Sequence, residues 1–266
     1  DIHFVRVFNM KTRGVIRPKP DQPTPPGIDY ERWLGPAPLR PFNPNHFWGG
    51  TWNWKWVYSG GDIVNDGVHQ MDLARWVIGK RYPKAVHAAA GIYYFKDGQD
   101  TPDTQMVTYE FEEGLVMTFS LTLWTPYMKK TPHEIRASDR FPPWPRNATK
   151  VEIYGTKGLM ILGRHGGGWQ VWGPDGSPGP YRYGRPPTSY HIQNFIECMW
   201  SRKRPNADIE EGHLSTLFCH LGNISYRVGC RRLIFDGEKE TFVNDPEANK
   251  LLKRDYRKPY VVPEEV

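Results

Sequence analysis

The sequence is poor in cysteine and has no long apolar run. Its 266 residues include three cysteines, Cys198, Cys219 and Cys230, which form no CxxC pair. This sparse, odd set excludes a disulfide framework, and we expect buried thiols on helices instead. No segment approaches the roughly 20 apolar residues of a membrane-spanning helix, so no membrane association is predicted. The 25 prolines and 26 glycines follow no fixed period, which excludes collagen and predicts many irregular loops.

Positive charge is in modest excess but is not concentrated. The formal net charge is +6, from 35 lysines and arginines against 29 acidic residues. The densest basic stretches, 202–204 and 253–258, lie near predicted helix ends, where cations also complement the helix dipole. No basic stripe or recognised motif is present, so no nucleic-acid partner is expected. Aromatic residues make up 14% of the chain, enough to bury a core and to exclude a disordered chain.

Hydrophobic patterns and turn signals divide the chain into a strand, a proline-rich arm, a helix, a run of strands and a group of helices. The arm covers 10–58 and includes a short turn of helix at 29–34. The expected strands are 2–9, 84–95, 104–112, 115–124, 149–155, 158–162 and 168–172. The expected helices are 62–78, 208–228 and 245–255. One more helix, before 208, has an apolar face made of Ile192, Phe195, Ile196 and Met199. A loop is expected at 173–187.

Strands and helices are segregated along the chain, which is typical of α+β proteins. We therefore predict a single α+β domain over 1–266, with an open, mainly antiparallel sheet and helices packed on one face. Parallel βαβ alternation is absent, and so is a GxGxxG loop. The stretch GRHGGG at 163–168 has the wrong spacing and precedes a strand rather than a helix. An N-terminal nucleotide-binding Rossmann domain is therefore expected to be absent from this chain.

The segment 60–76, GGDIVNDGVHQMDLARW, is the most informative for chemistry. Asn65, His69 and Asp72 are spaced at i, i+4 and i+7, so they share one face of a helix. A histidine between an amide and a carboxylate can be oriented and its pKa tuned, which suits a general base that removes a proton from a hydroxyl. The alternative is an ordinary first helical turn that contains a hydrogen-bonded histidine.

The same segment resembles the signature of the C-terminal domain of the Gfo/Idh/MocA family, the relatives of glucose–fructose oxidoreductase and inositol dehydrogenase. The family pattern reads roughly GGGxxxDxGxHxxDxxRW. The stretches WLGPAP at 33–38 and RPFNP at 40–44 resemble the arm of a bacterial subgroup. HLGNI at 220–224 resembles a late helix of the same subgroup. Together these matches extend over essentially the whole chain.

The resemblance implies one half of a two-domain oxidoreductase that moves hydride between a carbohydrate carbon and NAD or NADP. It implies that His69 is the general base, that Asn65 and Asp66 belong to the catalytic group, and that Gly60 and Gly61 contribute to cofactor binding. The family has Asp where this chain has Asn65, and Asp66 lies about 100° further round the helix. The chain is expected to be the second half of such an enzyme or a stand-alone relative of that half.

Aromatic residues at the end of the arm fit a sugar site, because flat rings stack on sugar C–H faces while polar groups bind hydroxyls. The candidate substrate-binding residues are Trp54, Lys55, Trp56, Tyr58 and Asp72. The alternative is that the rings pack the arm against the core. No metal site is predicted, although a site made of His191, His213 and His220 can be imagined.

Two other functions remain open. The chain could be a stand-alone domain that binds or transforms a sugar as a lyase or isomerase without a nicotinamide, or it could be an oligomerisation scaffold. A homodimer or tetramer is expected through the free face of the sheet. Localisation is open between the cytoplasm and the bacterial periplasm. Plausible contributors to the free sheet face are Tyr93, Phe95, Thr108, Phe119 and Trp124.

Overall fold

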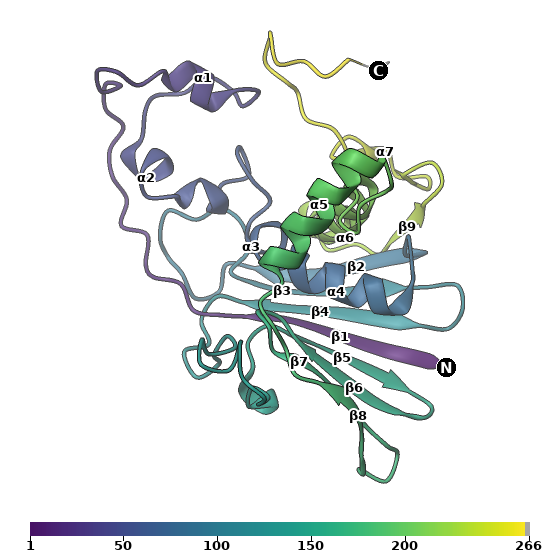
Figure 1. Ribbon diagram of the computed structural model, residues 1–266. Coiled ribbons are helices and arrows are strands. Elements are labelled where there is room, and N and C mark those ends of the chain that lie inside the picture. The colour runs from purple at the N-terminus through teal and green to yellow at the C-terminus, as the bar shows by residue number, and fades with distance from the viewer. Residues whose placement is uncertain (264–266) are drawn as a thin grey trace.

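A ten-stranded sheet forms the body of the protein in the computed structural model, which describes residues 1–263. Its strand order is β10-β9-β2-β3-β4-β1-β5-β6-β7-β8 (Figure 1). All neighbours are antiparallel except β1 and β4, which run parallel. The strands are β1 Ile2–Met10, β2 Ala85–Gly91, β3 Thr104–Glu110, β4 Val116–Thr122, β5 Lys150–Gly155, β6 Gly158–Gly163, β7 Gly168–Trp172, β8 Pro178–Arg182, β9 Leu233–Asp236 and β10 Thr241–Phe242.

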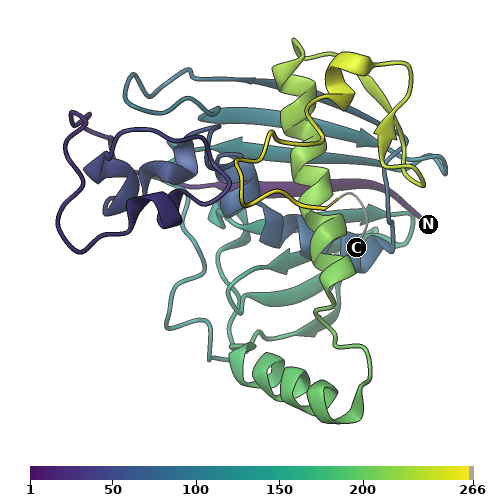
Figure 2. The same ribbon diagram turned by 90° about the horizontal axis from the view of Figure 1, so that it is seen from above.

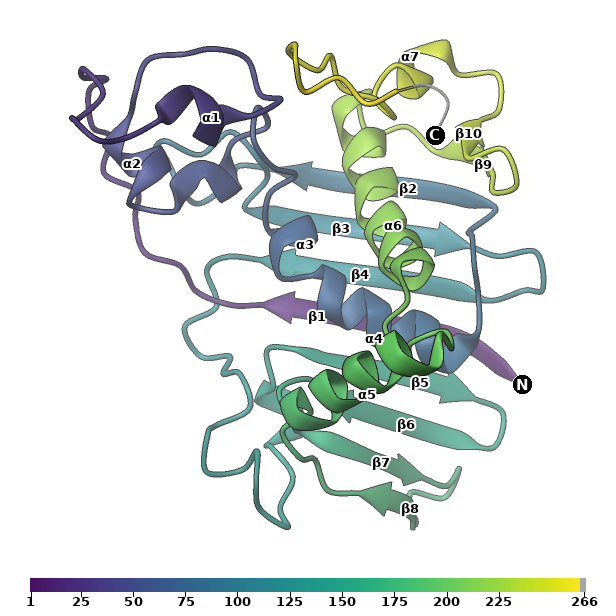
Figure 3. The same cartoon turned by 45° about the horizontal axis from the view of Figure 1, so that its top comes forward.

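The helices gather on one face of this sheet, as predicted for an α+β fold (Figures 1 and 3). Helix α4 packs on β1 and β5, and α6 packs on β2 and on α4. The helices are α1 Tyr30–Leu34, α2 Pro44–Phe47, α3 Asp62–Asn65, α4 Val68–Ile78, α5 Thr188–Ser201, α6 Ile209–Arg227 and α7 Pro246–Asn249, with 3-10 turns η1 Thr51–Trp54 and η2 Trp144–Arg146. No Rossmann domain occurs within residues 1–263.

Strict alternation along the central strands builds the core. In β3, Val107 and Tyr109 are buried against the helices, whereas Met106 and Thr108 face the uncovered side. Phe119 of β4 pairs with Val107 and is also fully buried. Because neighbours in a strand point to opposite faces, the sheet carries one apolar layer under α4 and α6 and one face without helices.

The predicted helix 62–78 is interrupted at Asp66 and Gly67. The backbone N–H groups of both residues donate to the carbonyl of Asp62, so α3 closes before α4 begins. A Cβ atom on Gly67 would lie 2.5 Å from Cζ of Phe119 and 2.6 Å from the carbonyl oxygen of Ile63. Gly67 therefore allows the junction of the two helices to sit directly on the sheet.

The arm folds into a small module with its own core. Asp29 caps α1, the short helical turn predicted over 29–34, by accepting from the N–H of Arg32. Tyr30, Leu34 and Phe42 form a separate buried cluster. Figure 3 shows this module beyond the end of strands β2–β4, away from α4.

The C-terminal segment is bound to the arm mainly through Arg257. The Arg257 guanidinium donates to the carbonyls of Glu31, Gly35 and Ala37. It also forms an ion pair with the carboxylate of Glu31 at 3.0 Å. This contact ties the arm to the far end of the described chain.

Several predicted boundaries were wrong for identifiable reasons. The strand expected to reach residue 95 ends at Gly91, because the carboxylate of Asp103 accepts the backbone N–H groups of residues 93–95. The loop predicted at 173–187 contains β8, an edge strand, where prolines are tolerated. The helix expected over 245–255 ends at Asn249, whose side chain bonds the backbone of Phe242 instead. The short β9 and β10 were not predicted.

Helix α5 has the apolar face predicted from its sequence, yet none of its residues is buried. Ile192, Phe195, Ile196 and Met199 are each about half exposed, and Trp200 is 86% exposed. Figure 2 shows α5 separated from the sheet beyond the end of α6. A contiguous exposed apolar patch of this kind marks an interaction surface. No helix among the described residues is both long enough and apolar enough to cross a membrane.

Candidate functional site

The three polar residues predicted to share a helical face lie on two helices, on either side of the break at Asp66 and Gly67. Asn65, at the end of α3, and His69 and Asp72, on α4, are all exposed to solvent. Asp66, between the two helices, is buried. His69 is therefore accessible to solvent, whereas the carboxylate of Asp66 is not.

Asp62 forms the innermost part of the site. Its side chain is buried, and Lys11 Nζ lies 2.7 Å from its Oδ1 atom. Asn9 donates to Oδ2 at 2.7 Å, and Gln70 in turn donates to Asn9 at 3.0 Å. Burial raises the pKa of Asp62 above its ordinary value, while the charge of Lys11 opposes that effect. The contacts of Asp62 with Asn9 and Lys11 fix the start of α3 against the end of β1.

Asp66 forms ion pairs with three cationic side chains from separate parts of the chain. Lys11 and Lys130 each place Nζ 3.1 Å from its Oδ2 atom, and Arg164 forms an ion pair with Oδ1. Burial acts to raise the pKa of Asp66, but the hydrogen bond from Arg164 and the three positive charges hold it well below its usual range. Asp66 is therefore ionised at any physiological pH.

His69 is held in the neutral form. Desolvation by the surrounding protein and the charge of Arg164 lower the pKa of His69, and Asp66 and Asp72 oppose this effect. Although the residue is exposed, these cations reduce its tendency to bind a proton. A neutral imidazole at neutral pH can accept a proton from a bound hydroxyl. Desolvation and the cation cluster thus together favour the protonation state that a general base needs.

Asp72 also has a structural contact. Ser215 on α6 donates to its Oδ1 atom at 2.7 Å, and Arg75 donates to the same serine at 2.8 Å. Arg75 further pairs with Glu211. Asp72 therefore links α4 to α6 from the face that carries His69, and its assignment to substrate stays a prediction.

The aromatic residues predicted to line a sugar site point in different directions. Trp54 lies beside the cluster, since Lys11 Nζ is 5.9 Å from its ring centroid. Trp56 stacks on Tyr226, at the end of α6. Tyr58 packs into the core of the arm. The structure thus brings only Trp54 of these rings to the polar cluster.

Lys55 lies apart from the polar cluster. Its Nζ atom is 3.6 Å from the carboxylate of Asp100, a partly exposed ion pair. Asp100 also accepts the backbone N–H of Trp56. These contacts fix the end of the arm, and the assignment of Lys55 to substrate stays a prediction.

Gly60 and Gly61 are buried where the chain enters α3. The carbonyl of Gly60 accepts a hydrogen bond from Asn223 of α6 at 2.7 Å. Gly61 has φ +74°, and a Cβ there would lie 2.8 Å from Thr101. Both positions require glycine for packing, and their assignment to a cofactor stays a prediction.

His165 is a site residue that the sequence analysis did not identify. It follows Arg164 directly and has φ +60°, an uncommon conformation for a residue other than glycine. Its buried Nε2 atom has no hydrogen-bond partner within residues 1–263. Desolvation and the charges of Arg164 and Lys130 lower the pKa of His165 to about 4. The neighbourhood is therefore strongly positive.

Lys11, Lys130 and Arg164 were also missed. The only sequence signal was the glycine-rich stretch 163–168, which contains Arg164 and His165. Its spacing does not match that of a dinucleotide-binding loop, so it was not assigned a function. Its function in the structure is to close the turn between β6 and β7. Nothing local in the sequence indicates that these cations converge on Asp66.

The histidines considered for a metal do not come together. His213 bonds Glu240, His191 is exposed on α5, and His220 is largely enclosed on α6. In the described part of the chain, no group of three metal-ligating side chains is present.

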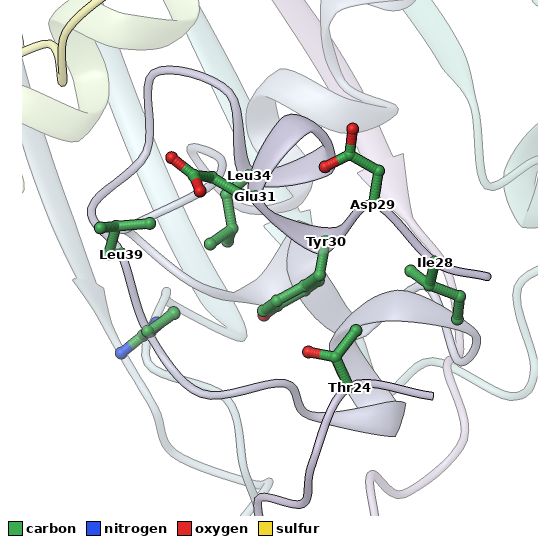
Figure 4. Close-up of a pocket in the computed structure, with 8 residues that line it drawn as sticks. Thr24, Ile28, Asp29, Tyr30, Glu31, Leu34 and Leu39 are labelled. Atoms are coloured by element: carbon green, nitrogen blue, oxygen red, sulfur yellow. The ribbon is translucent and has the colours of Figure 1, made fainter. Parts of the chain in front are cut away.

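A pocket of about 600 Å³ lies in the arm rather than at His69. Figure 4 shows Tyr30 at its centre, with Thr24, Ile28 and Leu39 around it. No residue of the polar cluster lines it. It is therefore a feature of the arm module and not an extension of the candidate site.

Two sequence models of one protein family match the chain. The first, described as the GFO/IDH/MocA C-terminal domain, matches residues 38–161. The second, described as the C-terminal alpha/beta domain of the oxidoreductase family, matches residues 183–262. The two matches do not overlap and together extend over most of the chain. No curated protein matches the sequence.

Solved structures share the fold at low sequence identity. The WlbA dehydrogenase from Bordetella pertussis, crystallised with NADH and UDP-GlcNAcA, is 18% identical with a TM-score of 0.54 over 88% of this chain and 55% of its own. An aldose-aldose oxidoreductase from Caulobacter crescentus, complexed with glycerol, is 14% identical with a TM-score of 0.57 over 88% and 56%. Levoglucosan dehydrogenase, in complex with NADH and levoglucosan, is 16% identical with a TM-score of 0.53 over 92% and 59%. This chain thus spans little more than half the length of these structures.

Proposed function

Because the chain belongs to the Gfo/Idh/MocA family as its C-terminal domain, we propose that it is the substrate-binding and catalytic half of an NAD(P)-dependent oxidoreductase acting on a sugar or polyol. The observation that carries this proposal is His69. It is exposed, as Asn65 and Asp72 are, and desolvation together with the charge of Arg164 lowers its pKa, which favours the neutral ring.

The proposed reaction step for this chain is proton removal. His69 accepts the proton of a substrate hydroxyl while hydride leaves the same carbon for the nicotinamide. The nicotinamide supplies the hydride acceptor, and this half of the enzyme supplies the base and the substrate contacts. Asn65, in place of the carboxylate of the family pattern, orients polar groups without adding charge, and the carboxylates near His69 are Asp66 and Asp72.

The nucleotide-binding part would come from the remainder of a longer protein. This chain covers only 55% and 59% of two similar structures, both of which contain NADH. Residues 1–263 contain no dinucleotide-binding fold. The assignment of Gly60 and Gly61 to the cofactor stays a prediction, since both are buried within this chain.

The first test is an assay for nicotinamide reduction. The complete protein is expected to reduce NAD or NADP in the presence of a sugar or polyol, whereas residues 1–266 alone are expected to bind the sugar without reducing either cofactor. The measurements are nicotinamide absorbance across a panel of sugars and the melting temperature of the isolated chain with each sugar. Sugar turnover by the isolated chain without any nicotinamide would refute the proposal and favour a lyase or isomerase.

The exposed apolar face of α5 is the surface that we expect the nucleotide-binding part to cover. Phe195→Glu should lower the activity of the complete protein about tenfold or more, because a charge would be buried in that contact. The stability of the isolated chain should change by less than about 0.5 kcal/mol, since Phe195 is 55% exposed there.

Gln193→Glu is the matched control for this variant, because it adds the same charge to an exposed position on the same helix. The control should retain activity. Equal losses in both variants would show that α5 responds to charge in general and does not form a specific contact.

Self-association through the uncovered sheet face stays a prediction. Of the residues considered for that face, Phe95 and Phe119 are buried in the core and cannot contribute. Tyr93 and Trp124 are exposed, and Thr108 points to the uncovered side. A homodimer or tetramer would be recognised by the mass of the complete protein in solution, and a monomer at high concentration would contradict it.

A further inference from the structure

The guanidinium of Arg164 donates hydrogen bonds through only one of its three nitrogen atoms. Its Nη1 atom donates to the carboxylate and carbonyl of Asp66 and to Oε1 of Gln70, the last at 3.4 Å. Neither Nε nor Nη2 has a hydrogen-bond partner among residues 1–263, and neither belongs to the buried polar atoms without partners. Two nitrogen atoms of the guanidinium are therefore unpaired and not fully buried, on a side chain that is 16% exposed.

Lys130 also has N–H donors without a partner in the described chain. Its ammonium group carries three N–H donors, and its one contact in the described chain is with Oδ2 of Asp66 at 3.1 Å. The side chain is 38% exposed, the most exposed of the three cations around this carboxylate. Lys130 is therefore anchored on the protein side and open on the solvent side.

Positive charge at this site exceeds the negative charge that the protein supplies. Lys11, Lys130 and Arg164 share two carboxylates, those of Asp62 and Asp66. The surplus acts on His69, whose pKa falls partly because of the charges of Arg164 and Lys130. Arg164 donates to the carbonyl of Asp66 and to Gln70, the residue that follows His69, and Lys130 contacts the same Asp66. Both cations therefore lie beside the helical junction that carries His69.

We propose that the outward donors of Arg164 and the ammonium of Lys130 bind an anionic group, carboxylate or phosphate, on the sugar whose hydroxyl lies at His69. Arg164 presents paired N–H groups that match two oxygens of such a group, and Lys130 adds a point charge. This inference rests on the proposed function, and it narrows the substrate class from sugars in general to sugar acids or sugar phosphates.

The test is direct binding to the 266-residue chain, measured by calorimetry with glucose, glucuronate and glucose 6-phosphate. One or both anionic sugars should bind at least tenfold more tightly than glucose, and which of them does so separates carboxylate from phosphate. Lys130→Gln should weaken binding of the anionic sugar about tenfold and leave binding of glucose unchanged. Lys129→Gln, which removes the same charge from the adjacent exposed residue, should have little effect.

Arg164→Lys is the second variant, because it keeps the charge beside Asp66 but removes the paired outward donors. It should also weaken the anionic sugar about tenfold, with an unchanged melting temperature as evidence of folding. Equal affinity for glucose and both anionic sugars, equal losses in Lys129→Gln and Lys130→Gln, or no binding of any sugar would each overturn the inference. Turnover of neutral sugars by the complete protein would still support the proposed function in those cases.

Discussion

His69→Ala is expected to lower the turnover of the complete enzyme by a factor of about 10² to 10⁴, the usual contribution of a positioned general base. The loss should appear in kcat, because the base acts on the proton in the transition state and not on substrate binding. The side chain is exposed, so its removal leaves no cavity and the melting temperature should not change. Steady-state kinetics and a thermal melt of the same preparation measure both quantities.

The matched control is His3→Ala, since His3 is exposed at the opposite end of β1 from Lys11. The pH profile is a second readout. The pKa of His69 is lowered, so kcat/KM should be constant at neutral pH and fall only as the pH drops through that lowered value and the ring becomes protonated. In His69→Ala this acidic limb should disappear. Normal turnover in the variant would refute the role of His69.

Asp62→Ala is expected to destabilise the domain by about 3 kcal/mol. The substitution leaves the amide of Asn9 without its acceptor and removes one of the two carboxylates that neutralise Lys11. The side chains of both partners are largely enclosed, so water can replace the lost acceptor only in part. Reversible urea unfolding of the isolated chain measures the change.

Asp139→Ala is the appropriate comparison for Asp62→Ala. Like Asp62, Asp139 forms one ion pair, in its case with Arg185, but the side chain of Asp139 is 71% exposed. A surface pair of this kind contributes between about 0 and 1 kcal/mol, so this variant should unfold almost as the parent does. If the two variants lost equal stability, the buried cluster would not be a structural centre of the domain.

The fold class could be predicted because its signals are local. Alternation along β3 and β4 and the turn residues between them indicate a hairpin regardless of the rest of the chain. His69 could be located for the same reason, since a single helical segment contains Asn65, His69 and Asp72. The break at Gly67 was harder to predict, because it depends on the close approach of Phe119 from another strand.

The cation cluster could not be predicted from the sequence. Lys11 follows β1, Lys130 lies in the loop after β4, and Arg164 follows β6. These positions meet at Asp66 only because β1 is inserted between β4 and β5 in the sheet. A pattern of hydrophobic residues predicts strands but not their order, so the charge environment of His69 depends on information that no single segment contains.

The position of β1 also affects how the protein is made. This strand, the first of the described chain, pairs Phe4 with Val116 on one side and Val5 with Ile153 on the other. During synthesis it leaves the ribosome long before either neighbour exists, so the backbone N–H and C=O groups on both of its edges stay unpaired until then. Contacts between segments so far apart form slowly. Chaperones that shield nascent strands should therefore have a larger influence on the yield of this protein than on the stability of the finished molecule.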